Sequence, residues 1–145
     1  MTSESEIIIT LADGRRVDAL VLGHTVRTDQ PVDEGGEDSA PAPFDLFLAS
    51  IGTCAGSFVQ AFCAKRGISY EGIRIIEHPS FGADGLLRSV ALDIELPPSF
   101  PERYREALIR LTEQSSVKCA IAAAPVFTVR ALRPPAVVAQ ALTVP

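Results

Sequence analysis

Two cysteines of this chain stand in surroundings that favour thiol chemistry. Cys54 lies inside a long apolar segment, residues 43–67, and Cys119 opens a second apolar segment, residues 115–125. If the two segments pack together, the two sulfurs form a shielded pair that can pass between dithiol and disulfide. Such a pair predicts a redox enzyme that acts on a small oxidant. The alternative for each cysteine is a small buried hydrophobic residue, which is a common role of a free thiol.

Helical geometry separates the third cysteine from the other two. Cys63 follows Cys54 by nine residues in a helical pattern, and at roughly 100° per residue this is about half a turn. The two side chains therefore point in opposite directions and cannot share a disulfide or a metal ion. We assign Cys63 to the core and keep Cys54 and Cys119 as the candidate pair.

A cysteine that attacks a peroxide must be a thiolate, so a nearby group has to stabilise negative charge. Cys54 lies in the interior of its predicted helix, where the helix dipole contributes little. It therefore requires a cation, and in an apolar pocket we expect an arginine because guanidinium stays charged when it is buried. Cys119 lies near the start of a short predicted helix, whose free N–H groups favour its thiolate as a leaving or resolving sulfur.

Size and charge limit the classes of function. The 145 residues are 47% hydrophobic and 21% charged, which predicts one globular domain spanning 1–145. The net charge of −5 and the absence of a basic stripe argue against a nucleic-acid partner, since phosphate binding needs clustered Lys and Arg. Three cysteines are too few for a structural disulfide framework.

The apolar segments also bear on the location of the protein. The most apolar stretch, residues 46–64, is interrupted by polar side chains and is typical of a buried core helix rather than a membrane span. The first ten residues have an acidic start and only a short apolar run, unlike a secretory signal. We therefore expect a cytoplasmic protein with no membrane partner.

The pattern of the chain predicts an α+β fold in which two small antiparallel sheets surround a long central helix. Its clearest element is a helix over 44–65 with an apolar face at helical spacing, ended by Gly67. The other elements are two strands within 6–22 around a turn at Asp13-Gly14, a strand at 24–28, an acidic loop at 29–43, strands at 73–77 and 88–95, a helix from a capping box at Ser99–Glu102 to about Gln114, a short helix with Cys119 that is capped by Ser115 or Ser116, and a last strand at 127–132.

The stretch from Asp33 to Cys54, DEGGEDSAPAPFDLFLASIGTC, together with the late cysteine before an apolar strand, resembles the OsmC/Ohr family of thiol peroxidases. The resemblance runs roughly from the second strand to Phe127. It implies that Cys54 attacks an organic hydroperoxide and becomes a sulfenic acid, and that Cys119 resolves it as a disulfide. It also implies an intertwined homodimer with both sites at the interface, reduction by dithiols such as lipoylated proteins, and no metal or organic cofactor.

The resemblance assigns two charged residues to the same site. Asp45 stands where the peroxidases carry a glutamate, and it would orient the arginine that stabilises the thiolate. We assign that arginine to Arg16, with Arg15 and Arg27 as alternatives. Both assignments compete with plainer roles, because an acid in the first turn of a helix is favourable on dipole grounds alone and arginines in a turn are usually solvated.

Two other classes of function remain open. The chain could form a non-catalytic, stress-associated or small-molecule-binding dimer, or Cys54 could hydrolyse an activated ester. His24 and His78 each stand alone in the sequence, so a zinc site is not expected. The lining expected around Cys54, with Phe47, Ile51 and Phe58, favours an organic hydroperoxide over hydrogen peroxide.

Overall fold

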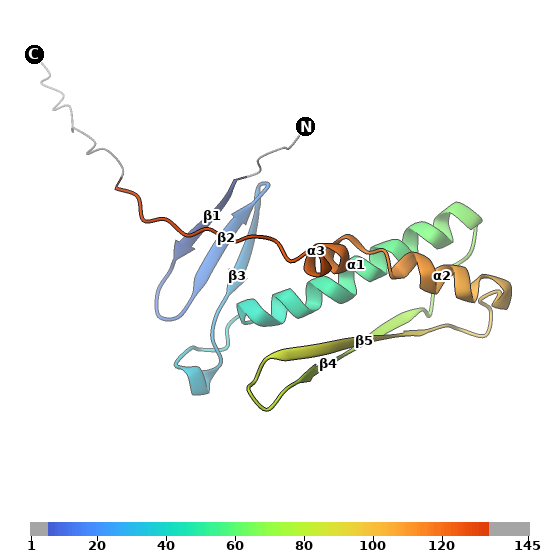
Figure 1. Ribbon diagram of the computed structural model, residues 1–145, viewed down its shortest axis with the longest axis horizontal. Coiled ribbons are helices and arrows are strands. Elements are labelled where there is room, and N and C mark those ends of the chain that lie inside the picture. The colour runs from blue at the N-terminus through green and yellow to red at the C-terminus, as the bar shows by residue number, and fades with distance from the viewer. Residues whose placement is uncertain (1–5, 134–145) are drawn as a thin grey trace, which may run out of the picture.

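The computed structural model describes residues 6–133 and has the predicted α+β architecture. The elements are β1 (Ile7–Leu11), β2 (Val17–Val21), β3 (His24–Thr28), α1 (Pro43–Arg66), β4 (Arg74–Phe81), β5 (Leu87–Glu95), α2 (Arg105–Thr112) and α3 (Ser116–Ala122), with short 3-10 helices at Val32–Glu34 and Glu102–Tyr104. Figure 1 shows α1 running beside the β4–β5 hairpin, with α2 and α3 also along it; α1 contacts β4, α2 and α3.

The first sheet is an antiparallel meander in the order β1-β2-β3, as the sequence predicted. The turn between β1 and β2 places Gly14 at φ 67°, a left-handed conformation that glycine adopts without steric cost. Every residue of β1 is exposed. Within residues 6–133, no helix and no second sheet packs extensively against this meander. A three-stranded sheet with so much exposed apolar surface needs something else to cover it.

Asp29 organises the acidic loop that joins β3 to α1. Its side chain is 1% exposed and accepts hydrogen bonds from the backbone N–H groups of Gln30 at 2.8 Å, Glu37 at 3.2 Å and Ser39 at 3.0 Å. The Ser39 hydroxyl donates a further bond at 2.6 Å. These bonds, those from Ser39 above all, lower the pKa of Asp29 to about 2 against the opposing effect of burial. The loop is therefore ordered around one carboxylate.

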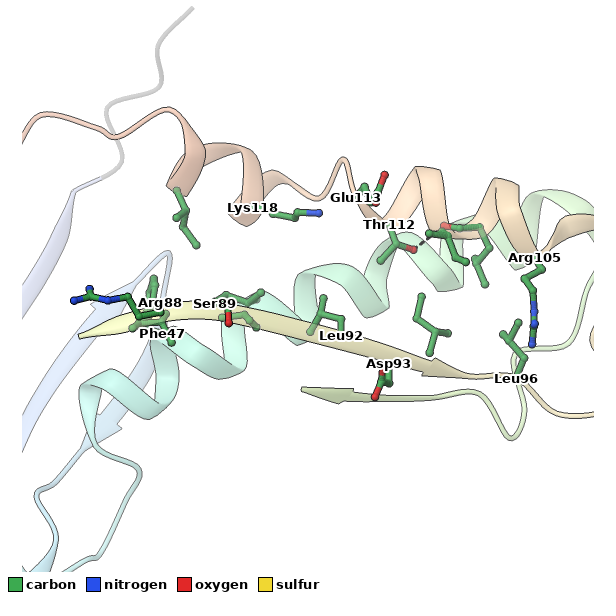
Figure 2. Close-up of a pocket in the computed structure, with 17 residues that line it drawn as sticks. Phe47, Arg88, Ser89, Leu92, Asp93, Leu96, Arg105, Thr112, Glu113 and Lys118 are labelled. Carbon is green, nitrogen blue, oxygen red and sulfur yellow. Dashed lines mark hydrogen bonds between the residues drawn. The ribbon is translucent and has the colours of Figure 1, made fainter. Parts of the chain in front are cut away.

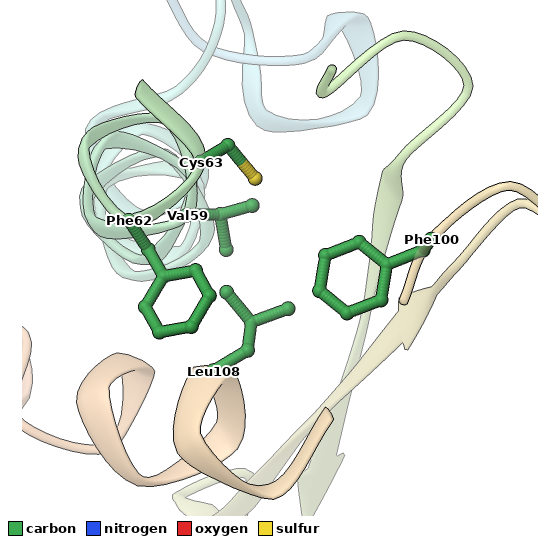
Figure 3. Close-up of a cluster of buried hydrophobic side chains, with 5 residues drawn as sticks. All are labelled: Val59, Phe62, Cys63, Phe100 and Leu108. Atoms are coloured by element: carbon green, nitrogen blue, oxygen red, sulfur yellow. The ribbon is translucent and has the colours of Figure 1, made fainter. Parts of the chain in front are cut away.

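Helix α1 begins and ends for local reasons. Pro43 occupies its first turn, where the missing N–H costs nothing, and Gly67 ends it with φ 62° and a backbone N–H that bonds back to the carbonyl groups of Cys63 and Ala64. One stripe of α1 is buried. Figure 3 shows the core at its C-terminal half, formed by Val59, Phe62, Cys63, Phe100 and Leu108. This confirms the expected core position of Cys63.

The second sheet consists of β4 and β5, and β4 is longer than predicted. The sequence predicted a strand over 73–77, whereas β4 continues through Pro79 to Phe81 and pairs with β5 along its length. Proline lacks an N–H but is tolerated on an edge strand, and in a sheet of two strands each strand is an edge. The strand predicted at 88–95 is confirmed, with one more residue at its start.

Two predictions about the later part of the chain are wrong. The capping box at Ser99–Glu102 does not form: the helical segment opens with a 3-10 turn after Pro101, has no side-chain cap bond and ends at Thr112. The segment 127–132 is not a strand, although it has the apolar pattern of one. A strand needs a neighbour to complete its hydrogen bonds, and within the described chain this segment has none; Phe127 is 87% exposed and Val129 is 96% exposed.

By length and composition alone, α1 is apolar enough to cross a membrane. Core helices of globular proteins meet the same test. In this structure the C-terminal half of α1 packs against Phe100 and Leu108 in the core.

The Asp29 cluster predicts an acid-dependent contribution to stability. The folded pKa of about 2 lies below the ordinary value of 3.8, so the ionised carboxylate contributes stability that is complete above about pH 4 and is lost as the pH falls through about 2. We expect Asp29→Asn to lower the free energy of unfolding at pH 7. The free energy of unfolding of this variant should also fall less than that of the wild type between about pH 4 and about pH 2. Chemical denaturation at each pH measures both effects.

The matched control is Asp33→Asn, which removes the same charge from an exposed residue of the same loop. Equal stability of the two variants at pH 7 would contradict the role given to Asp29.

Candidate thiol site

Cys54 lies at the edge of the buried stripe of α1. The stripe includes Ile51, Ala55 and Val59, all buried, and Cys54 precedes Ala55 by one residue, which turns it about 100° away from the stripe's centre. It is half-buried as a result and carries a free thiol. This position is open to a reactant without being fully in solvent.

Cys119 lies on α3, the helix that packs against α1. Its thiol is free and exposed. The structure therefore brings the two thiol-bearing helices into contact, as the sequence predicted for their segments. A disulfide between the thiols is not present in this state of the described chain.

The start of α3 differs from the expectation in one respect. The backbone N–H of Cys119 bonds to the carbonyl of Ser115 at 3.0 Å, so its own amide is not free to stabilise a thiolate. The sulfur lies 3.7 Å from the carbonyl oxygen of Gln114, a contact that a thiol donates and a thiolate cannot. Ser115 is the N-cap residue, as one of the two predicted alternatives, but its side chain makes no cap hydrogen bond.

The charged residues assigned to the site are not gathered around Cys54 in the single chain. Arg16 pairs with Asp13 in the β1–β2 turn at 3.8 Å, and Arg27 is an exposed residue of β3. Asp45 is exposed in the first turn of α1. Within residues 6–133, no ion pair or hydrogen bond joins Arg16 or Asp45 to either candidate thiol.

A groove of about 710 Å³ lies between β5 and the helices α2 and α3. Figure 2 shows β5 as its floor, with Leu92 on that strand, Leu96 just after its end and Phe47 from α1 at the other end. Phe47 and Ile51, two of the three side chains expected around Cys54, line this groove. The thiols of Cys54 and Cys119 are not part of its lining, so the groove adjoins the thiol-bearing helices without containing the sulfurs.

Sequence reasoning missed the carboxylate of Glu77. This β4 side chain reaches across to α1 at Gly52, where a Cβ atom would stand 2.8 Å from its Oε2 atom. Burial raises the pKa of Glu77, and a hydrogen bond from the backbone of Gly52 partly opposes that shift. Its Oε1 atom is buried with no hydrogen-bond partner among the described residues. The sequence contained one signal for this contact. Gly52 lies inside a predicted helix, and a glycine there often marks a place where another element approaches the helix closely.

The described residues contain no group of three His, Cys, Asp or Glu side chains placed to hold a metal ion.

The sequence profile of the OsmC-like protein family matches residues 36–130, and the chain belongs to this family. Comparison with curated protein sequences finds no match.

Solved structures share the fold at low sequence identity. A protein of Psychrobacter arcticus, described as an osmotic stress induced and detoxification response protein, has 19% identity and a TM-score of 0.70 over 83% of this chain and 90% of its own. An OsmC-like protein of Mycoplasma pneumoniae has 14% identity and a TM-score of 0.66 over 86% and 91%. An organic hydroperoxide resistance protein of Legionella pneumophila has 20% identity and a TM-score of 0.52 over 83% and 90%. These likenesses establish the OsmC-like fold.

The three thiols differ enough in exposure to predict an order of labelling. We expect iodoacetamide to alkylate exposed Cys119 and half-buried Cys54 well before Cys63. Cys63 is fully buried and burial raises its pKa, so its labelling requires opening of the core and should be slower by about a thousandfold or more. Peptide mass spectrometry at successive times measures the order. Labelling of Cys63 as fast as Cys119 in the folded protein would contradict this core.

Proposed function

We propose that this protein is a thiol-dependent peroxidase that reduces organic hydroperoxides through Cys54 and Cys119. The observation that carries the proposal is the contact between α1 and α3, each with a free thiol that is at least partly accessible. Membership of the OsmC-like family and the description of the Legionella neighbour as a redox protein support a redox or stress role.

The proposed cycle uses only thiol chemistry. The thiolate of Cys54 attacks one oxygen of the peroxide, the O–O bond breaks, and the alkoxide leaves as the alcohol after it takes a proton. Cys54 is then a sulfenic acid. The sulfur of Cys119 attacks it, an S–S bond forms, and water leaves. An external dithiol, such as a lipoylated protein, reduces the disulfide by exchange and returns both thiols.

The surroundings of Cys54 favour a substrate with an organic group. Phe47 and Ile51 lie on the same helix and line the adjacent apolar groove. Burying part of the substrate against such side chains stabilises its complex by roughly 25 cal/mol per Å² of apolar surface, which hydrogen peroxide cannot provide.

The proposed active state is a homodimer. The single chain leaves β1 exposed along its whole length, and it leaves the apolar segment 126–132 extended without a strand partner among the described residues. Both are features that chains cover by pairing. We therefore infer that a second copy covers the first sheet, and that segment 126–132 takes part in that interface.

The dimer would also supply the cation that Cys54 requires. In the single chain, Arg16 lies on a sheet that does not pack extensively against α1. A second copy brings its own β1–β2 turn, and we infer that Arg16 of the partner subunit stabilises the Cys54 thiolate, with Asp45 as its orienting acid. The Asp13 pair that Arg16 makes in the single chain is exposed and therefore weak, so it can be exchanged for this contact.

A second candidate function is a small-molecule-binding dimer without catalysis. The groove of about 710 Å³ favours it, since its volume is typical of small-molecule sites. Hydroperoxide consumption separates the two candidates, because a binding protein consumes none.

The peroxidase proposal predicts distinct defects for the three cysteines. With tert-butyl hydroperoxide and dihydrolipoamide, we expect Cys54→Ser to lose at least about a hundredfold in turnover, since it lacks the nucleophile. Cys119→Ser should consume one equivalent of peroxide rapidly and form a sulfenic acid. Coupled consumption assays and sulfenic-acid trapping measure these results.

Cys63→Ala is the matched control and should stay active, because Cys63 belongs to the core. Equal turnover by wild type and Cys54→Ser would exclude the mechanism. Turnover of an activated ester with no change in the number of thiols would indicate hydrolysis instead.

Complementation tests the origin of the cation. We expect Arg16→Ala and Cys54→Ser each to be inactive as homodimers. Co-refolding the two chains in equal amounts should restore about a quarter of wild-type activity, because about half the dimers are mixed and each mixed dimer has one complete site when Arg16 acts across the interface. No recovery in mixed dimers, confirmed by differential tagging, would show that Arg16 acts within its own chain, and wild-type activity of the Arg16→Ala homodimer would show that it has no role.

A further inference from the structure

The groove above β5, whose Phe47 and Ile51 would also contact the organic group of a peroxide, can hold a ligand that takes no part in the thiol chemistry. Its walls are mainly apolar: Ile51 from α1, Leu92 from β5, Leu108 and Ile109 from α2, and Ile121 from α3. A concave apolar site of about 710 Å³ falls within the range of pockets that hold small organic molecules. The charged residues of its lining are Arg88, Asp93, Arg105, Glu113 and Lys118.

Three of the charged lining residues already have an exposed polar partner in the chain. At the two ends, Arg88 pairs with Asp84, and Arg105 pairs with Glu102 at 3.5 Å. On the floor strand, Asp93 pairs with His78 at 3.1 Å.

Lys118 differs from these groups. Within residues 6–133 it makes no ion pair, and Figure 2 shows its side chain extending from α3 across the space above β5 toward α2. Glu113 also lines the groove, and Figure 2 draws it on the side of α2 that is turned away from β5. Among the cations that line the groove, Lys118 is therefore the one that makes no ion pair within residues 6–133 and extends above the floor.

We propose that this groove binds a small amphipathic carboxylate, with its apolar chain on the β5 floor and its carboxylate at Lys118. One ammonium beside an apolar floor matches a monoanion with one apolar end. A polyanion such as a nucleotide would need more donors than this site offers. The apolar chain supplies most of the binding, and the charge pair selects an anionic head group over a neutral one.

The site is separate from the peroxidase chemistry. Neither Cys54 nor Cys119 lines the groove, so binding requires no thiol and no peroxide. Lys118 and Cys119 are neighbours on α3, but successive side chains of a helix point about 100° apart, which keeps the resolving thiol outside the groove.

The test compares two ligands of equal chain length on the full-length protein by NMR chemical-shift titration. We expect octanoate to bind about fivefold more tightly than octan-1-ol, the scale of one solvent-accessible charge pair. Lys118→Gln should remove this difference, and Lys118→Arg should keep it. Glu113→Gln should bind octanoate as tightly as the wild type or slightly more tightly, since it removes a negative charge that repels the carboxylate of octanoate.

Several results would overturn the proposal. They are an absence of saturable octanoate binding, equal binding of octanoate and octan-1-ol to the wild type, or an octanoate preference that survives in Lys118→Gln. Lys118 is exposed, so Lys118→Gln should fold normally, and thermal unfolding verifies it. The same titration on Cys54→Ser should give wild-type affinity, which keeps the outcome distinguishable from a failure of the peroxidase proposal.

Discussion

The structure depends on the burial of one stripe of α1. Ile51, Ala55, Val59, Phe62 and Cys63 face inward, and at the C-terminal half of the helix they pack with Phe100 and Leu108. This burial fixes the rotation of the helix about its axis. Cys54 is placed at the edge of the stripe by that rotation, and the side of the helix that bears Gly52 is turned toward β4. A rotation by one residue would bury Cys54 and expose Ala55, so the chemistry of the thiol follows from core packing.

One part of the chain packs against α1 and another part does not. The β4–β5 hairpin, α2 and α3 all contact α1, whereas the β1–β3 meander and segment 126–132 keep large apolar side chains in solvent. Exposed apolar surface of this extent is usually an interface. The proposed dimer accounts for both unpaired regions at once, and it explains why Arg16 stands apart from Cys54 within one chain.

The sequence was sufficient for the parts of the fold that local patterns determine. The Asp13-Gly14 turn, the apolar periodicity of α1 and the Gly67 stop each act within a few residues, and each prediction is confirmed. The continuation of β4 through Pro79 depended on which strand neighbours it, and segment 127–132 has no strand neighbour among the described residues. The Asp29 cluster joins residues up to ten positions apart, and Glu77 reaches Gly52 across two elements. No local pattern contains such contacts. For the candidate site, the thiol-pair hypothesis required the segments of Cys54 and Cys119 to pack together, and α1 and α3 are in contact. The arginine that would stabilise the Cys54 thiolate is a proposal.

The central claim is that the sulfurs on α1 and α3 form one redox pair. Peptide mapping of the protein after one equivalent of tert-butyl hydroperoxide, with free thiols blocked at acidic pH, tests it most directly. The account predicts a single new cross-linked peptide pair joining Cys54 to Cys119, with Cys63 still a thiol, and its reversal by dihydrolipoamide. Both sulfurs recovered as unmodified thiols, or Cys54 joined to some other cysteine, would contradict it.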